Sequence, residues 1–235
     1  MGNTEDQALT PLQMELRDAM GPWGCSLCRL ALKAEHACID SLSYERVLDL
    51  KTRSALKASR GLCAHHTRIW QRLQGSALGV AIVYRIALLD LLRDTDPETY
   101  DGRTPFWRRG PAQETAERLA SDGPCPACEI GKGTVQRFGE VLLADLVNPE
   151  SQTLLRASGG LCLPHLRTVL GLRGADEVFE TLLRVQREAW QGLMAELEEF
   201  IRKNDYRFTD EKMTEAEATA WTRVLDVIVG LEDRA

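Results

Sequence analysis

Eight cysteine and histidine side chains recur in two sets of matched order and spacing. Each set has a CxxC pair, followed 34 or 35 positions later by a CxxH pair. Three thiolates and one imidazole form a common ligand set for structural zinc. The sequence therefore predicts two four-ligand metal sites, each within one copy of the pattern: Cys25, Cys28, Cys63 and His66 in the first, and Cys125, Cys128, Cys162 and His165 in the second.

The spacing within each pair explains how two side chains could hold one ion. Ligands three residues apart in the first turn of a helix lie on the same face. The positive end of the helix dipole at that turn also favours thiolate over thiol. Four protein ligands leave no position for a substrate, which is typical of a structural zinc site. A [4Fe–4S] cluster accepts the same ligands, so two such clusters stay open as the alternative to two zinc ions.

The pattern around the ligands is an internal duplication. Residues 59–66 read SRGLCAHH and residues 158–165 read SGGLCLPH, 99 positions later. The glycines Gly61 and Gly160 suit a turn from the end of one helix into the next, because glycine has no Cβ to clash there. We therefore expect two copies of one structural unit.

The segments that must position the ligands have helical periodicity, and none has a convincing strand pattern. We expect an all-α fold of two tandem helical bundles with approximate twofold symmetry, each with a Cys3His site at helix N-termini. The predicted ranges are 1–95 for the first unit, 96–123 for a linker rich in turn residues, and 124–235 for the second unit. Helices are predicted over residues 11–19, 25–42, 44–58, 64–73, 77–93, 112–120, 125–146, 149–157, 164–172, 176–203 and 218–229, with Ser43 capping the third.

The composition is that of an ordinary soluble globular protein, with 44% hydrophobic and 27% charged residues among 235. Seven cysteines, an odd number, suit a reducing cytoplasm with Cys38 left free. We expect a cytoplasmic protein without a signal peptide. The most apolar segment, residues 77–92, carries Arg85 and Asp90, so a buried helix is predicted there rather than a membrane span.

One stretch of the first copy is strongly basic although the chain has a net charge of −6. Such a run is usually a solvated face, but clustered cations also attract anions and acidic partners. We expect a protein partner here before a nucleic acid, because the acidic chain as a whole disfavours nonspecific nucleic-acid binding. The basic residues of this run are Arg46, Lys51, Arg53, Lys57, Arg60, Arg68 and Arg72.

The layout resembles an uncharacterised bacterial family of unknown function. In that family a C-P-x-C pair, a short acidic helix and a G-[FL]-C-x-x-H string occur twice. The second copy fits with Cys125-Pro126-Ala127-Cys128, whereas the first has Ser26 where proline is usual. The resemblance covers nearly the whole chain and implies an all-α protein with paired Cys3His sites, but it carries no activity with it.

No catalytic pattern accompanies the ligands. The sequence lacks a Ser-His-Asp order, a phosphate-binding glycine loop and an HExxH string, so an enzyme is less expected than a non-enzymatic protein. We predict a metal-binding helical protein that acts as an interaction or regulatory module, with structural zinc as the metal. The alternative is an iron–sulfur protein with two [4Fe–4S] clusters in electron transfer or redox sensing.

Overall fold

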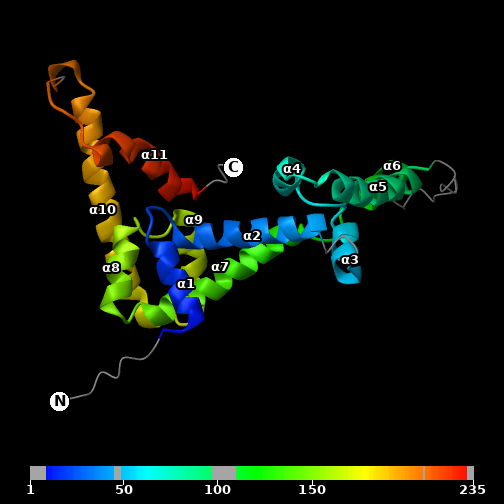
Figure 1. The fold of residues 1–235 in the computed structure, drawn as a ribbon, viewed down its shortest axis with the longest axis horizontal. Coiled ribbons are helices and arrows are strands. Elements are labelled where there is room, and N and C mark those ends of the chain that lie inside the picture. Colours follow the sequence, from blue (N-terminus) through cyan, green and yellow to red (C-terminus); the bar gives the residue numbers. More distant parts are fainter. Residues whose placement is uncertain (1–8, 45–48, 97–109, 209, 232–235) are drawn as a thin grey trace, which may run out of the picture. The chain divides into compact units, whose positions relative to one another are not determined.

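The computed structural model describes residues 9–44, 49–96, 110–208 and 210–231. Within these ranges the protein is helical and contains no strand, so the predicted all-α class is confirmed (Figure 1). The helices are α1 (Pro11–Met20), α2 (Ser26–Tyr44), α3 (Leu50–Ala58), α4 (Ala64–Arg72), α5 (Ala77–Asp94), α6 (Pro111–Leu119), α7 (Pro126–Asp145), α8 (Pro149–Ala157), α9 (Leu163–Leu170), α10 (Phe179–Lys203) and α11 (Glu215–Val229), with 3₁₀ turns at Asp176–Val178 and Tyr206–Phe208.

Side-chain caps set several of the helix starts. α1 and α11 each begin with a reciprocal capping box, from Thr10 with Gln13 and from Thr214 with Glu217. The predicted start of the third helix at Ser43 is wrong. α2 continues to Tyr44, and α3 begins after Asp49, whose carboxylate accepts a 2.8 Å hydrogen bond from the Thr52 amide. Residues 45–48 lie outside the described residues.

The contacts divide the chain into two compact units. Unit 1 comprises Met1–Lys33 and Lys132–Arg234, and unit 2 comprises Ala34–Gly131. The boundaries between the units fall inside two helices. α2 begins in unit 1 and ends in unit 2, and α7 begins in unit 2 and ends in unit 1. This grouping differs from the consecutive ranges expected from the repeat. Whether residues 1–95 and 124–235 fold independently, joined by the linker 96–123, stays a prediction.

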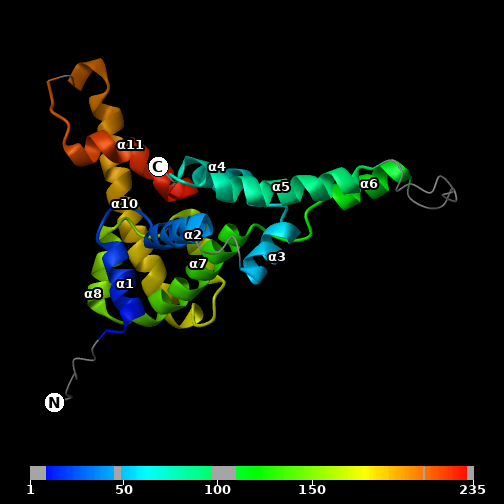
Figure 2. The same ribbon diagram turned by 45° about the vertical axis from the view of Figure 1, so that its right-hand side comes forward.

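The core of unit 1 is formed by buried apolar faces of α1, α2, α7, α8, α9 and α10. α8 packs against α1 and α10, and α11 contacts α10 and α9 (Figures 1 and 2). Because these faces recur at helical spacing, each helix buries one stripe and exposes its charged side. Fully buried members of this core include Leu16, Met20, Leu27, Leu142, Leu146, Leu155, Leu161 and Leu182.

The core of unit 2 is smaller. α5 contacts α3, α4 and α6, and the centre of the unit is the fully buried ring of Trp70. The remaining buried apolar residues include Ile39, Leu42, Leu56, Ile69 and Val83. α5 is the apolar helix predicted from the sequence, but the predicted burial is wrong: only Gly79, Val83 and Ala87 are buried. Several of its leucines are exposed, namely Leu78, Leu88, Leu89 and Leu92. No helix in the part of the chain that the structure describes has the length and apolarity to cross a membrane.

A buried ion pair fixes α1 to the end of α7. Nε and Nη2 of Arg17 lie 3.1 and 3.3 Å from the two carboxylate oxygens of Asp145. Asp145 also accepts hydrogen bonds from Gln13 and from the hydroxyl of Ser151, at 3.2 and 2.5 Å. The Asp145 side chain is only 4% exposed, so its charge depends on these partners.

We predict that Asp145→Ala lowers the free energy of unfolding by about 3–5 kcal/mol, because Arg17 would keep only its ion pair with the exposed Glu150 while Gln13 and Ser151 would lose their acceptor. Urea denaturation followed by circular dichroism measures this loss. The matched control is Lys33→Ala, which breaks the exposed pair between Lys33 and Glu15 and should cost about 0–1 kcal/mol. Equal losses in the two variants would contradict a structural role for the buried pair.

Candidate metal centres

The eight predicted ligands form two Cys3His groups, and in each group the four donor atoms lie within 4.8 Å of one another. The predicted pairing within each copy is wrong, because the CxxC pair of one copy meets the CxxH pair of the other. Site 1 lies in unit 1 and site 2 in unit 2. Site 1 consists of Cys25, Cys28, Cys162 and His165, and site 2 consists of Cys63, His66, Cys125 and Cys128.

Each pair occupies the same two positions at the start of a helix. Cys63 and Cys162 are the N-cap residues of α4 and α9, with extended backbone angles and no side-chain cap hydrogen bond. Their histidines, His66 and His165, are the third residues of those helices. The CxxC pairs take the same two positions at the starts of α2 and α7. The predicted placement at helix N-termini is confirmed, and each site receives the positive ends of two helix dipoles.

The distances between donor atoms are short. In site 1, Nδ1 of His165 lies 3.4 Å from Sγ of Cys25 and 3.3 Å from Sγ of Cys28, and the Sγ atoms of Cys28 and Cys162 are 3.6 Å apart. A tetrahedral ion with bonds of about 2.0–2.3 Å would hold its ligand atoms about 3.5–3.8 Å apart. The donor atoms of site 1 are therefore spaced as around one small ion.

Site 2 has the same spacing. Nδ1 of His66 lies 3.2, 3.4 and 3.6 Å from the Sγ atoms of Cys63, Cys128 and Cys125. The Sγ atoms of Cys63 and Cys128 are 3.8 Å apart. Both sites thus present three sulfurs and the Nδ1 atom of a histidine around one point.

The donor groups of site 1 shift one another's pKa values in opposite directions. Burial raises the pKa of the Cys25 thiol, but hydrogen bonds with Cys162 and Cys28 outweigh burial and hold this pKa well below its usual range. Hydrogen bonds with Cys162 and Cys25 raise the pKa of Cys28. For His165, burial lowers the pKa, whereas hydrogen bonds with Cys162 and Cys25 raise it to about 10. These opposite shifts arise because the donor groups lie close enough together to share one cation.

The thiols of site 2 are also shifted in opposite directions. Burial raises the pKa of Cys63, but a hydrogen bond with the His66 backbone and contacts with Cys128 outweigh it and lower this pKa. Burial and the charge of Cys125 raise the pKa of Cys128 to about 12. The donor sets of both sites therefore suit a cation that binds thiolates.

Buried polar side chains hold the turns before the CxxH pairs. In site 1, Gln186 of α10 binds both backbone groups of Leu161, accepting from N–H at 2.8 Å and donating to C=O at 3.1 Å. Gly160 has φ +80°, and a Cβ there would overlap Gln186. In site 2 the hydroxyl of Tyr84 on α5 accepts from the Leu62 amide at 3.2 Å. Sequence reasoning missed both partners, because neither lies near a ligand in the chain.

A carboxylate lies behind the histidine of site 2. Oε2 of Glu35, on α2, lies 3.3 Å from Nε2 of His66, although the two groups are not aligned as a hydrogen bond. Glu35 also packs on Gly131 of α7, where a Cβ would overlap the carboxylate. A carboxylate behind a metal-binding histidine orients the ring and strengthens the ligand. Sequence reasoning missed Glu35, which no spacing rule connects to His66.

The predicted basic surface is partly used inside unit 2. Arg60 donates 2.9 and 3.1 Å hydrogen bonds to Asp94 and to the carbonyl of Ala120, and Lys57 lies 3.9 Å from Asp90. Lys51, Arg53 and Lys57 on α3 are exposed, as are Arg68 and Arg72 on α4, whereas Arg46 lies outside the described residues.

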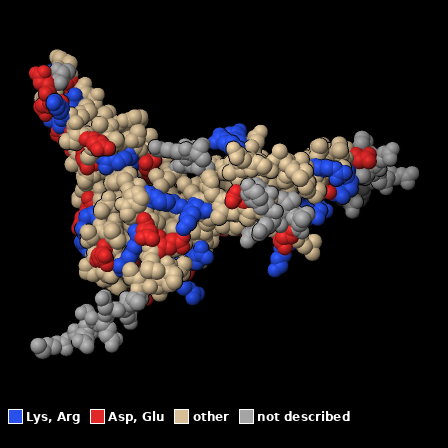
Figure 3. Space-filling model, in the orientation of Figure 1, with Lys and Arg blue, Asp and Glu red and all other residues tan. Residues whose placement is uncertain are grey.

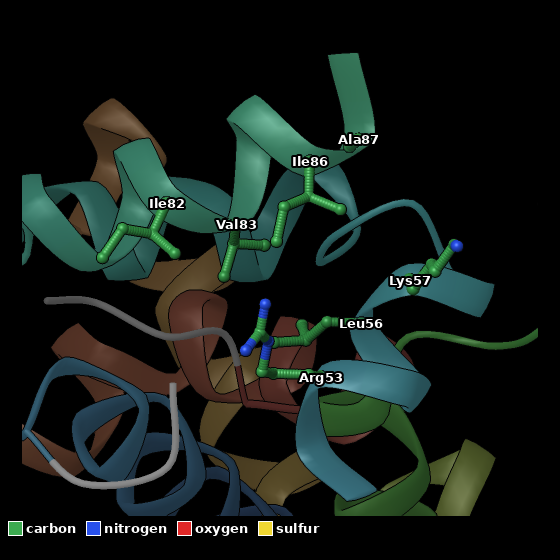
Figure 4. Close-up of a pocket in the computed structure, with 7 residues that line it drawn as sticks. All are labelled: Arg53, Leu56, Lys57, Ile82, Val83, Ile86 and Ala87. Carbon is green, nitrogen blue, oxygen red and sulfur yellow. The ribbon is translucent and has the colours of Figure 1, made fainter. Parts of the chain in front are cut away.

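Arg53 lies in the gap between α3 and α5. It lines a cavity of about 20 Å³ with Leu56, Val83 and other apolar residues (Figure 4). A volume of this size is near that of a single water molecule, so the cavity is too small for a larger ligand. In Figure 4, Arg53 extends toward Val83 while the ammonium of Lys57 points away. The stem of Arg53 therefore covers apolar surface, as long basic side chains often do.

Cys38 and His65 are of ligand type but lie outside both sites. Cys38 is buried in the core of unit 2 and belongs to neither ligand group. His65 is exposed, and its ring meets that of His66 edge to face, with 4.9 Å between ring centroids. His66 rather than His65 supplies the nitrogen of site 2, in agreement with the sequence prediction.

Comparison with known proteins identifies the family and no activity. Residues 11–233 match the model of DUF6062, a family of unknown function, and the chain belongs to this family. No curated protein and no solved structure matches the chain. The predicted resemblance to a family of unknown function is confirmed, and the chemistry must be argued from the two sites.

We predict that Glu35→Gln weakens Zn²⁺ binding at site 2 about 10- to 100-fold, because His66 loses the charge that orients it. Competition with a chromophoric zinc chelator measures both affinities, and site 1 should be unchanged. The control is Glu140→Gln, an exposed carboxylate on α7. Gly131→Ala should reproduce the effect by displacing Glu35 without altering any ligand. Unchanged affinity in both variants would rule out the proposed influence of Glu35 on His66.

Proposed function

We propose that this protein binds two zinc ions, one in each unit, and that the ions fasten long-range contacts of a non-enzymatic helical interaction module. The observation that carries the proposal is the gathering of eight donor atoms into two groups with the spacing of a tetrahedral ion. Each ion would join helix starts that are far apart in the sequence. Site 1 would join α2 to α9, and site 2 would join α4 to α7.

A structural role is supported by the completeness of each ligand set. Three thiolates and one imidazole fill the four positions that zinc usually takes, so no position is left for water or substrate. Their net charge of about −1 with Zn²⁺ is partly offset by two helix N-termini at each site. Zinc bound in this way contributes directly to folding free energy.

The close spacing favours zinc over the iron–sulfur alternative. A [4Fe–4S] cluster places four irons and four sulfides between its ligands, so the cysteine sulfurs must stand farther apart than around a single ion. The recorded Sγ–Sγ distances of 3.6 and 3.8 Å suit the single ion. Redox chemistry through such clusters is therefore the less supported of the two functions.

In this proposal, the surface that binds a partner is formed by residues other than the metal ligands. The exposed residues of the basic run on α3 and α4 are the candidates for contact with an acidic protein: Lys51, Arg53, Lys57, Arg68 and Arg72. On the face shown in Figure 3, the Lys and Arg side chains are interspersed with Asp and Glu. That distribution supports a protein partner rather than the extended phosphate backbone of a nucleic acid.

Metal analysis of protein purified without oxygen tests the proposal. We expect about two zinc atoms per chain and no visible absorbance, because Zn²⁺ has a filled d shell. A coloured protein with several iron atoms per site would show that iron–sulfur clusters, and not zinc ions, occupy the sites. Protein without stoichiometric metal would contradict both assignments.

Paired serine substitutions test the exchanged ligand pairing. Cys28→Ser with Cys162→Ser removes two ligands of site 1 and should leave about one zinc atom per chain. Cys28→Ser with Cys63→Ser damages both sites and should leave both weakened. Pairing within each copy would give the reverse result. The site 1 variant should also lose several kcal/mol of stability in thermal melts, because structural zinc contributes to folding.

A further inference from the structure

The two sites differ in how far their sulfurs are protected from solvent. In site 1 all three cysteines are buried, with exposed fractions of 3% for Cys25, 5% for Cys28 and 1% for Cys162. In site 2, Cys125 is buried, whereas Cys63 and Cys128 are only half-buried. Reagents in solution therefore have a path to two sulfurs of site 2 that they lack at site 1.

The segment after α11 covers site 1. The amide of Leu231 lies 3.4 Å from Sγ of Cys28 and donates to it. Gly230 has φ +94°, and a Cβ there would come within 3.3 Å of Sγ of Cys28 and 3.5 Å of Sγ of Cys162. The backbone thus lies directly on two sulfurs, in a conformation and at a distance that favour glycine.

The two half-buried sulfurs of site 2 are also neighbours. Sγ of Cys63 and Sγ of Cys128 are 3.8 Å apart and come from the starts of α4 and α7. A disulfide bond has a length of about 2.0 Å, so a small approach of the two helix starts would join them. Cys125 and His66 would then be the remaining ligands, too few to retain zinc in a four-coordinate site.

We propose that Cys63 and Cys128 are sites of reversible oxidation by peroxides, and that their oxidation expels the ion of site 2 while site 1 keeps its own. This inference rests on the proposed zinc binding. One thiolate attacks a peroxide oxygen, giving a sulfenic acid and hydroxide. The second thiolate attacks the sulfenic sulfur, the disulfide forms, and a second hydroxide leaves. The two thiolates lose two electrons in total, and hydrogen peroxide gains them as its O–O bond breaks.

Hydrogen peroxide added to the zinc-loaded full chain tests the proposal. A chromogenic zinc chelator reports release of the ion, and peptide mapping by mass spectrometry locates the disulfide. We expect one zinc atom per chain to leave roughly tenfold or more faster than the other, with a bond between Cys63 and Cys128. Dithiothreitol with Zn²⁺ should restore the original content. Release of both ions at one rate, or a first disulfide between Cys28 and Cys162, would overturn the proposal.

Two glycine variants test whether the segment after α11 protects site 1. Gly230→Ala pushes the segment off the sulfurs, so peroxide should release the ion of site 1 at a rate approaching that of site 2. Gly192→Ala is the control, because a Cβ there meets no other atom within 4 Å, and it should behave as wild type. An unchanged rate in Gly230→Ala would contradict protection by this segment.

The zinc content measured before peroxide is added distinguishes failure of the proposed zinc binding from failure of the proposed oxidation of site 2. If two zinc atoms are present and leave at the same rate, the zinc-binding proposal stands and the selective oxidation of site 2 is wrong. A chain without stoichiometric zinc would overturn both, because the expelled ion is part of the inference. Cys38→Ser should change neither result, because Cys38 lies in the core of unit 2 outside both sites.

Discussion

The convergence of side chains at helix starts is the constraint on which the rest of this structure depends. At all four ligand pairs the first residue stands at the beginning of a helix and the second is three positions on, so both point to the same place. Local backbone geometry thus prepares half of each site before any tertiary contact forms. Each half can be completed only by another helix start, and this requirement determines which helices must meet.

The long helices α2 and α7 meet this requirement by joining the two units. α2 has 19 residues, begins at the Cys25–Cys28 pair in unit 1 and ends in unit 2. The chain that follows, including α3 and Cys63, stays in unit 2. Cys63 consequently meets the start of α7, and Cys28 meets the start of α9. Because α2 and α7 each run from one unit into the other, the CxxC pair and the CxxH pair of one copy belong to different units and do not form one site.

The surroundings of the two sites have diverged although their ligands are the same. The turn before the CxxH pair is held by the amide of Gln186 in one unit and by the hydroxyl of Tyr84 in the other. Gly159 has φ +87°, whereas the corresponding residue of the first copy, Arg60, takes φ +54° and bonds to Asp94. Site 1 is covered by backbone, while site 2 has Glu35 behind its histidine. Equal ligand sets therefore stand in environments of different exposure and charge.

The sequence by itself determined the helical class, the eight ligands and their place at helix starts, because each depends on contacts within one helical turn. The capping boxes of α1 and α11 are local for the same reason. Only the tertiary structure decided the exchange of partners between Cys28 and Cys63, because that choice depends on where α2 ends. It also decided the roles of Glu35, Gln186 and Gly230, each far in sequence from the ligands it approaches or supports. Contacts between residues far apart in the chain have no fixed spacing, so a single sequence gives no pattern from which they could be predicted.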